Sequence, residues 1–542
     1  MGIVQMLDCT LRDGAYVVDA KFGVPVIKGI IKKLQEARIN IIECGWLKDQ
    51  PYEQGSTFYH VPFDLEQFVL DKKKNIVYTA MIDWNRYNTD DLPDCNGKSL
   101  DAIRVVFPKE KYKEGIAVGN RIKKKGYQVY FQAANTLAYS DDELIELAAE
   151  INQVNPAAVS IVDTFGAMFG EDLEHIVAIL NQHLNEGIAL GFHAHNNQQM
   201  AFALEMRFVE LLVSDTRNII VDSCLCGMGR GAGNATTELI AGYLNRKQQG
   251  NYDMNVILDA IDMYMGDFIS QYQWGYSTPY FIAGMYCAHV NNISYLLENH
   301  RTNSMDIKNI IESLSEKDRK QYDYALLEEK YLEYENKVVN DEQTLSVIRE
   351  NCYKRKVLLL LPGKTILDYY DDIIGYIKEN NPLVFGVNAV MTAYPCDYIF
   401  FSNKVRYEYA KDIYSDEFSE INKLVFSNIK TVPGEKEMVV NFNLLVKRGW
   451  KHFDNAGIMC LRFLNRVQAM NVAIAGFDGF ENAHSENYAD ASLPFINPGV
   501  SWDDLNSEIK DMFQDFKKST VKDMEISFIT PSKFGDRELT ND

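Results

Sequence analysis

Short apolar runs alternate with amphipathic stretches along the first 225 residues. The amphipathic stretches, such as 24–37 and 141–154, repeat apolar residues with a period near 3.6, as helices do. The apolar runs are rich in β-branched residues, as strands are, and lie at 3–7, 39–45, 75–82, 102–107, 127–133, 157–163, 188–195 and 218–225. Eight strands alternating with helices predict a protein of the α/β class whose first part is a (β/α)₈ TIM barrel.

The regular alternation of strands and helices ends after the eighth predicted strand. Charged, helix-forming residues dominate 253–352, which predicts a helical extension and connector. A strand, turn, helix and strand then follow at 356–388, and this βαβ pattern begins a smaller, doubly wound, Rossmann-like α/β domain. Its further predicted elements are strands at 397–403, 437–445 and 472–480 and a helix at 455–470. We therefore expect three domains, at 1–252, 253–352 and 353–542.

Composition narrows the possible partners. The chain has 542 residues, 46% of them hydrophobic, with a net charge of −21. An acidic surface attracts neither nucleic acid nor an anionic membrane, so we expect no binding to either. No apolar run approaches the roughly 20 residues that span a bilayer. The nine cysteines form no C-x-x-C pair and the chain starts with a strand-like run, which favours a reduced, cytoplasmic setting.

The predicted barrel indicates where chemistry should lie, because active sites of such barrels sit at the C-terminal ends of the strands. The segment GFHAHNN, at 191–197, ends the seventh strand. His193 and His195 are two residues apart in that strand, so they share one face. Taken alone, the two histidines could simply be polar residues on a solvent-exposed face of the strand. With the carboxylate of Asp13, after the first strand, it predicts a divalent-metal site with open positions for substrate.

The eighth strand is followed by a glycine-rich loop, GMGRGAGN, at 227–234. Its alternating glycines let the backbone approach a ligand closely. Asn234 ends the loop and has two possible roles. Its amide oxygen is a further candidate metal ligand, and its side chain could instead cap the following helix.

Three motifs together resemble the DRE-TIM metallolyases, the superfamily of 4-hydroxy-2-oxovalerate aldolase, hydroxymethylglutaryl-CoA lyase and isopropylmalate synthase. They are LDCTLRDGAY (7–16), GFHAHNN (191–197) and GMGRGAGNATTE (227–238), and the resemblance covers about residues 1–300. It implies that Asp13, His193 and His195 bind Mn²⁺ or Mg²⁺, although imidazole would suit Zn²⁺ equally. It also implies that Arg12 stabilises an enolate. Glu43 completes the family's Asp, Arg and Glu set, as an ion-pair partner that could orient Arg12.

The first motif and WGYSTPY, at 274–280, most resemble the 4-hydroxy-2-oxovalerate aldolase branch. This implies a carbon–carbon lyase acting on an α-keto acid and an aldehyde through a pyruvate-type enolate. A Claisen-type transferase using an acyl-CoA, or a non-catalytic binding or scaffold protein, remains an alternative. The oligomeric state stays open, a homo-oligomer being possible.

The chain departs from that branch at Tyr16. Those aldolases carry a catalytic histidine two residues after the glycine of the RDG motif, and this chain has a tyrosine. A phenol with an ordinary pKa near 10 is a poorer base at neutral pH. In the same branch a tyrosine after the barrel enters the active site. Tyr276 and Tyr280 are the candidates, with simple aromatic packing as their alternative.

The last domain resembles the nucleotide-binding fold of bacterial sialyltransferase-like and motility accessory proteins. That resemblance implies a nucleotide or nucleotide-sugar site at Gly363, Asn388 and Asp478, which follow predicted strands. The sequence GKT at 363–365 is not a P-loop, because Leu358 stands where that motif needs glycine. The turn could still hold a phosphate through its backbone N–H groups.

Overall fold

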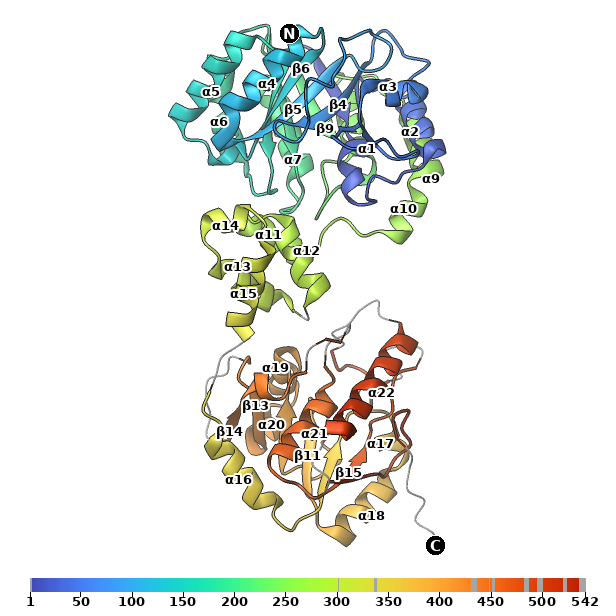
Figure 1. The fold of residues 1–542 in the computed structure, drawn as a ribbon, viewed down its shortest axis with the longest axis vertical. Coiled ribbons are helices and arrows are strands. Elements are labelled where there is room, and N and C mark those ends of the chain that lie inside the picture. Colours follow the sequence, from blue (N-terminus) through green and yellow to red (C-terminus); the bar gives the residue numbers. More distant parts are fainter. Residues whose placement is uncertain are drawn as a thin grey trace. The chain divides into compact units, whose positions relative to one another are not determined.

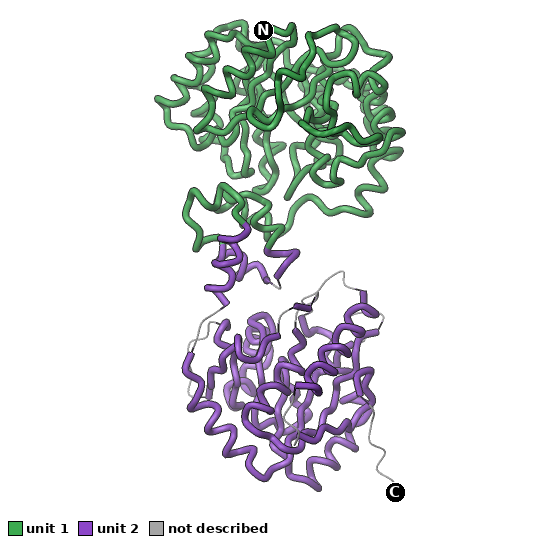
Figure 2. Tube along the Cα trace, in the orientation of Figure 1, with its two compact units in different colours: residues 1–295, 311–323 green, residues 296–310, 324–542 purple. Residues whose placement is uncertain are grey.

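The computed structural model describes residues 2–300, 302–335, 339–429, 436–447, 449–450, 454–481, 487–494, 501–519 and 524–535. Its contacts divide the chain into two compact units (Figure 2). Unit 1 comprises residues 1–295 and 311–323, and unit 2 comprises residues 296–310 and 324–542. The helical stretch 253–352 is thus shared between the units, and the three domain boundaries expected from the sequence stay predictions. No described helix has the length and apolar character needed to cross a membrane.

Unit 1 is built on a closed barrel of parallel strands ringed by helices (Figure 1). Within residues 2–300 its eight strands are β1 (Val4–Asp8), β2 (Ile41–Leu47), β4 (Val77–Asp83), β5 (Ala102–Pro108), β6 (Gln128–Ala134), β7 (Ala158–Asp163), β8 (Ala189–Ala194) and β9 (Ile219–Ser223). The first strand closes the ring, because it pairs with both the second and the last of them. The short β3 (Phe58–Tyr59) extends the edge of β2. The TIM barrel predicted from the sequence is confirmed, strand by strand.

The barrel helices form where the apolar period indicated. They are α2 (Val24–Glu36), α4 (Tyr112–Lys124), α5 (Asp141–Val154), α6 (Gly170–His183), α7 (Ala201–Leu212), α8 (Thr237–Arg246) and α9 (Met254–Tyr264), with the short α3 (Pro62–Leu65). In α2, Ile27, Ile30, Ile31 and Leu34 recur at helical spacing and are buried against the strands.

Charged residues occupy the centre of the barrel instead of the usual branched aliphatic layers. Arg104, in the middle of β5, is buried and donates Nη1 to Glu43 at 2.8 Å. Its Nη2 donates to Gln132 at 2.8 Å and also to Asp222. One guanidinium therefore connects four strands, and its charge compensates two buried carboxylates.

The helices between the two sheets are short. They are α10 (Gly266–Gln271), α11 (Thr278–Met285), α12 (Val290–Asn299), α13 (Ser304–Ser313), α14 (Glu316–Lys320), α15 (Tyr324–Glu335) and α16 (Glu342–Cys352). Ser277 caps α11 by accepting the N–H of Tyr280, which fixes where that helix begins.

Unit 2 contains an open parallel sheet in the order β14-β13-β12-β11-β10-β15-β16. Its described strands are β10 (Val357–Leu360), β11 (Leu383–Val387), β12 (Tyr398–Phe401), β13 (Asn422–Phe426), β14 (Glu437–Val440), β15 (Asn471–Ala475) and β16 (Glu525–Phe528). The strand order reverses between β10 and β15, which is the switch point where doubly wound sheets bind ligands. The predicted fold class is confirmed, while β13 and β16 were absent from the sequence prediction.

Helices cover both faces of this sheet. In β10, Val357 and Leu359 pack in one apolar cluster, and Leu358 and Leu360 pack in the other. The first cluster includes residues of α16, α19 (Lys404–Ile413), α21 (Ala456–Arg466) and α22 (Trp502–Ser519). The second includes residues of α17 (Thr365–Asp368) and α18 (Tyr370–Asn380). The helix α20 (Ser415–Glu420) follows α19.

Candidate active site

Three predicted metal ligands meet at the C-terminal rim of the barrel. Asp13 ends α1 (Thr10–Asp13), the turn directly after β1, and His193 and His195 lie at the end of β8. The Nε2 atoms of His193 and His195 lie 3.7 and 3.8 Å from Oδ2 of Asp13. The three ligand atoms lie within 4.8 Å of one another, close enough to hold one ion.

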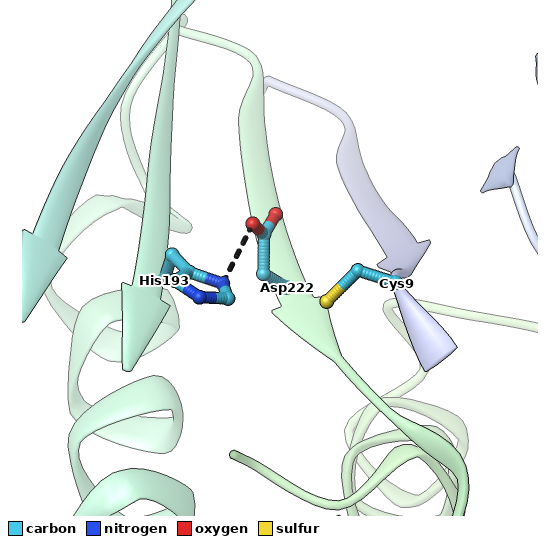
Figure 3. A group of neighbouring side chains, drawn as sticks. All are labelled: Cys9, His193 and Asp222. Atoms are coloured by element: carbon cyan, nitrogen blue, oxygen red, sulfur yellow. Dashed lines mark ion pairs between the residues drawn. The ribbon is translucent and has the colours of Figure 1, made fainter. Parts of the chain in front are cut away.

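Both histidines are oriented through their other ring nitrogen. Nδ1 of His195 lies 2.9 Å from the carbonyl oxygen of Asp163, and Nδ1 of His193 lies 3.0 Å from the Asp222 carboxylate (Figure 3). These contacts place a proton on Nδ1 and leave Nε2 facing Asp13. Metal-binding histidines in proteins are commonly held in this way.

The charges around the three residues differ strongly. Burial would raise the pKa of Asp13, but Arg12 and the two histidines outweigh it and hold that pKa below its usual range. Burial would lower the pKa of His193, but its bond to Asp222 raises it to about 9, so at neutral pH Nε2 carries a proton that a bound cation would displace. For His195, burial and the neighbouring His193 lower the pKa to about 4. Asp13 is thus an anion at neutral pH, as a cation ligand must be.

Two buried atoms beside Asp13 are suited to bind a cation. In the described part of the chain, Nε2 of His193 and Oδ1 of Asn234 are buried without a hydrogen-bond partner. Nδ2 of Asn234 donates to Asp13 at 2.6 Å, which places the amide beside the carboxylate. The helix-capping alternative for Asn234 is wrong, because α8 begins at Thr237 and its N-cap residue is Thr236. An imidazole nitrogen and a carbonyl oxygen left bare next to a carboxylate are suited to a divalent ion.

A second group, Cys9, His193 and Asp222, shares His193 with the first (Figure 3). Asp222 is already compensated by Arg104, and the Cys9 thiol lies 3.3 Å from the carbonyl oxygen of Ser223. Oδ2 of Asp222 and Nδ1 of His193 are therefore already paired within the protein. This group orients His193, and the group around Asp13 is the better metal site.

Arg12 lies against the same carboxylate. Its Nη1 is 2.9 Å from Oδ1 of Asp13, and its Nε donates to Glu43 at 2.7 Å. Across the residues that the structure describes, its Nη2 is buried and has no partner. The predicted ion pair between Arg12 and Glu43 is thus present, and it leaves one arm of the guanidinium for a ligand.

Tyr16 lies beside these residues in an aromatic and cationic environment. The Arg230 guanidinium is 3.8 Å from the centroid of its ring, and the Trp46 ring packs edge-on at 5.8 Å. Burial raises the pKa of Tyr16, which Arg230 only partly offsets. The phenol therefore stays protonated at neutral pH and is suited to donate a proton rather than to remove one.

The glycine-rich loop packs closely around this rim. A Cβ on Gly229 would come within 2.3 Å of Asn234, and one on Gly233 within 2.1 Å of the Gly227 carbonyl oxygen. Side chains at these positions would displace Asn234 from Asp13. Tyr280 reaches the same loop, since its ring lies 3.6 Å from where a Cβ on Gly231 would be. Tyr276 is 63% exposed, so packing against a core is not its role.

Comparison with known proteins shows which family the barrel resembles. Residues 108–264 match the family model described as HMGL-like. The part of the barrel from the end of β5 to the end of α9 is therefore HMGL-like. The resemblance to the DRE-TIM metallolyases is thereby confirmed for this half of the chain, whereas the resemblance proposed for residues 353–542 stays a prediction.

Relatives of the HMGL-like barrel include lyases of several kinds. Oxaloacetate decarboxylase of Mycobacterium tuberculosis is 28% identical over 260 residues, which is 47% of this chain and 74% of that protein. 4-Hydroxy-2-oxovalerate aldolase of Thermomicrobium roseum is 26% identical over 245 residues, 45% of this chain and 67% of that protein. Among solved structures, the HMG-CoA lyase of Bacillus subtilis is 15% identical with a TM-score of 0.39, covering 50% of this chain and 94% of that one.

The sequence analysis missed several residues that shape the HMGL-like site. Asp222 and Arg104 are charged residues inside apolar strands, and that break in the apolar pattern was the available signal. Arg230 is one of the two non-glycine residues between the loop's first three glycines. His289, before α12, is partly buried; burial, with Arg230 and His195 nearby, lowers its pKa to about 3, so it is neutral. Its position carried no sequence signal.

The predicted residues of unit 2 also come together. Gly363, Asn388 and Asp478 line one cavity of about 140 Å³, room for roughly ten water molecules. Asn388 donates to Ser402 Oγ at 2.8 Å and accepts the Ser402 N–H at 2.8 Å, so its side chain ties β11 to β12. Asp478 accepts the N–H of Thr365 at 2.8 Å.

Proposed function

We propose that the HMGL-like barrel makes or breaks a carbon–carbon bond next to the carbonyl of an α-keto acid, with a divalent metal bound. The carrying observation is the group of buried, unpartnered atoms around Asp13 among the described residues: His193 Nε2, Asn234 Oδ1 and Arg12 Nη2. His193 Nε2 and Asn234 Oδ1 can act as acceptors, and Arg12 Nη2 donates. Together they suit a cation and an anionic oxygen side by side, which is what an enolate site requires.

Asp13, His193 and His195 would hold the ion, with Asn234 as a further ligand. Mn²⁺ or Mg²⁺ is the expected ion and Zn²⁺ the alternative. When bound, it would supply Lewis-acid polarisation of the keto acid.

The residues of the chain would supply the rest of the chemistry. The free Nη2 of Arg12 would donate to the enolate oxygen, and Glu43 fixes the plane of the guanidinium through Nε. In the cleavage direction, a 4-hydroxy-2-oxo acid loses its hydroxyl proton, the bond between C3 and C4 breaks, and an aldehyde leaves. The electron pair stays on the pyruvate enolate, which then takes up a proton at C3. Tyr16 and Tyr280, both at this rim, are the proposed proton-handling groups.

Proton exchange tests this proposal without knowledge of the aldehyde. Metal-loaded protein should exchange the methyl protons of pyruvate with D₂O, because forming the enolate is half of the reaction. NMR measures the loss of the methyl signal. Arg12→Lys should slow exchange about 10²- to 10³-fold, since an ammonium lacks the planar fork. Arg207→Lys is a matched control, because Arg207 lies exposed on α7 and pairs with Glu174.

Other outcomes would redirect the assignment. Metal-dependent exchange on acetyl-CoA but not on pyruvate would favour the Claisen-type acyl transferase. Exchange on neither substrate would favour a binding or scaffold role. Retention of exchange in Tyr16→Phe would exclude the phenol as the enolising base and direct attention to Tyr280.

For unit 2, we propose that the cavity at Gly363, Asn388 and Asp478 binds a nucleotide or nucleotide sugar. Its place at the switch point between β10 and β15 supports this. Phe480 and Tyr488 add aromatic surface to the lining, which suits a base. Calorimetry of the full chain with cytidine and uridine nucleotides tests it, and absence of heat with all of them would contradict it.

A further inference from the structure

The cavity of unit 2 has an acidic side that is already occupied by protein contacts. Asp478 accepts the backbone N–H of Thr365 and also its hydroxyl proton. The first amides of the turn after β10 thus face a carboxylate. A phosphate there would meet a like charge, so the turn at 363–365 is a poor phosphate site. An anion would find a better site among the other lining residues.

Arg406 also lines the cavity, in the first turn of α19. The residue is only 5% exposed, and within the described ranges its Nη1 has no hydrogen-bond partner. Its guanidinium lies 4.8 Å from the centroid of the Tyr488 ring. Asp490 is near enough to act on its charge, but no ion pair between them is found within the described residues, and that carboxylate accepts from Tyr409 and Tyr414.

A buried guanidinium without a carboxylate partner is costly to the fold. Burial of such a cation is compensated in proteins by an ion pair or by a bound anion. Within the described residues Arg406 has no ion pair; its side-chain partner is Tyr488, a neutral phenol, and its Nη1 is unpartnered. The unpartnered arm therefore points to an anion that belongs in the cavity.

The N-termini of two helices also favour an anion in this cavity. α19 has ten residues and begins after Asn403, and α21 has eleven residues and begins after Asn455. Asn403, Asn455 and Gly457 all line the cavity with Arg406. Both helix N-termini, with their positive partial charge, therefore lie at the cavity that Arg406 lines, and Asn403 and Asn455 cap them by accepting N–H groups of the first turn.

We propose that Arg406 and the starts of α19 and α21 form a phosphate-binding subsite for a phosphate-bearing ligand. The planar fork of arginine matches two oxygens of a phosphate group, which a lysine would not do. The inference rests on the proposed function of the same cavity for its ligand class, but it names the group that is recognised and the residue that recognises it. Phosphate binds at Arg406, away from Asp478.

Calorimetric titration of the full chain tests this with pyrophosphate as the probe. Wild-type protein should bind pyrophosphate, and Arg406→Gln should bind it about ten- to a hundredfold more weakly, the effect of losing a charge-assisted contact. Lys411→Gln is the matched control, because Lys411 lies exposed on the last turn of the same helix. It removes the same charge and should leave the affinity unchanged.

A stability measurement separates ligand binding from a structural role. Without ligand, Arg406→Gln should unfold at the same temperature as wild type or higher, because it removes an uncompensated buried charge. Arg406→Lys keeps the charge and should bind with intermediate affinity, which keeps the test open if the glutamine variant does not fold. Unchanged pyrophosphate affinity in Arg406→Gln, no binding by wild type, or a lower unfolding temperature of the unliganded variant would each overturn the proposal.

Nucleosides and nucleotides distinguish this inference from the nucleotide proposal. Cytidine and uridine carry the base without phosphate, and their monophosphates carry both. If pyrophosphate binds through Arg406 and the monophosphates bind no better, the nucleotide proposal fails and the phosphate subsite stands. If nucleosides bind as well as monophosphates and Arg406→Gln changes nothing, the subsite fails and the nucleotide proposal stands.

Discussion

The two parallel sheets of this chain bring polar groups together in different ways. In the barrel, β1 and β8 end on the same closed ring, and their side chains meet over its centre. In unit 2, the strands end along an open edge, and the polar residues of the cavity gather where the strand order reverses, beside β10 and β15. A closed ring defines one meeting point for every strand, whereas an open sheet defines one only through its topology.

The two sites also differ in how they are held. Behind the barrel site lies the charged network of Arg104, Glu43 and Asp222. Behind the cavity of unit 2 lies an apolar layer that includes Phe385 and Phe400. A charged support fixes orientation at a cost in stability, and an apolar support contributes stability with less directional control. The following tests address that difference, starting with the largest expected effect.

The double variant His193→Ala and His195→Ala should abolish metal binding by the barrel. Elemental analysis of purified protein should fall from about one divalent ion per chain to a trace, and pyruvate exchange should fall by about 10³-fold or more, since several kcal/mol of charge stabilisation are lost. Pyrophosphate binding by unit 2 should not change. Unaltered metal content in the double variant would place the ion elsewhere.

Arg104→Met should destabilise the barrel by about 3–5 kcal/mol, because it leaves Asp222 buried without its guanidinium and Glu43 with Arg12 alone. Urea unfolding measured by fluorescence gives the change. Phe400→Leu is the comparison in unit 2, where a loss of about 1 kcal/mol is expected from a smaller apolar side chain. Equal losses in the two variants would mean that the charged centre is no more critical than the apolar one.

Glu205→Gln should stabilise the barrel at neutral pH. Glu205, on α7, is fully buried, and burial raises its pKa well above the usual value. The folded state keeps the proton while the unfolded state releases it above pH 4.5, so wild-type stability falls by up to about 1.4 kcal/mol per pH unit as pH rises past that value. Denaturant unfolding at pH 4 and pH 7 should show the variant's advantage only at pH 7. An equal difference at both pH values would rule out the titration.

Asp478→Asn should have the smallest effect. Its amide oxygen can still accept the Thr365 N–H, so stability should change by less than about 1 kcal/mol. Removal of the like charge should tighten pyrophosphate binding severalfold at low salt, and salt should reduce the gain. Weaker binding in this variant would put the phosphate at Asp478 and not at Arg406.

More of the candidate site could be predicted from the sequence in the barrel than in the open sheet of unit 2. Strand ends in a barrel converge whatever the pairing details, so Asp13 and His193 could be brought together from periodicity alone. The role of Arg104 was not predicted, because a single charged residue inside an apolar strand has no evident function until its partners across the barrel are known. Arg406 escaped because its importance lies in a missing partner, and only coordinates show which atoms lack one.

Missed elements in unit 2 have a related cause. β16 (Glu525–Phe528) is an edge strand with one buried residue, and its short alternation does not stand out from a loop. The predicted strand at 437–445 ends at Val440, because Asn441 turns the chain into a short 3₁₀ segment.

The pairing of β1 with both β2 and β9 sets the order in which the barrel can be completed during synthesis. Asp8 pairs with Ile42 and also with Ser223. At roughly 5–20 residues per second, translation needs about 10–40 seconds to pass from the end of β2 to the end of β9. During that interval the edge of β1 that will pair with β9 is exposed. For most of it the histidines of β8, which will lie next to Asp13, have not yet been synthesised. Closure of the ring and assembly of the proposed metal site therefore both wait on the last strands of the barrel.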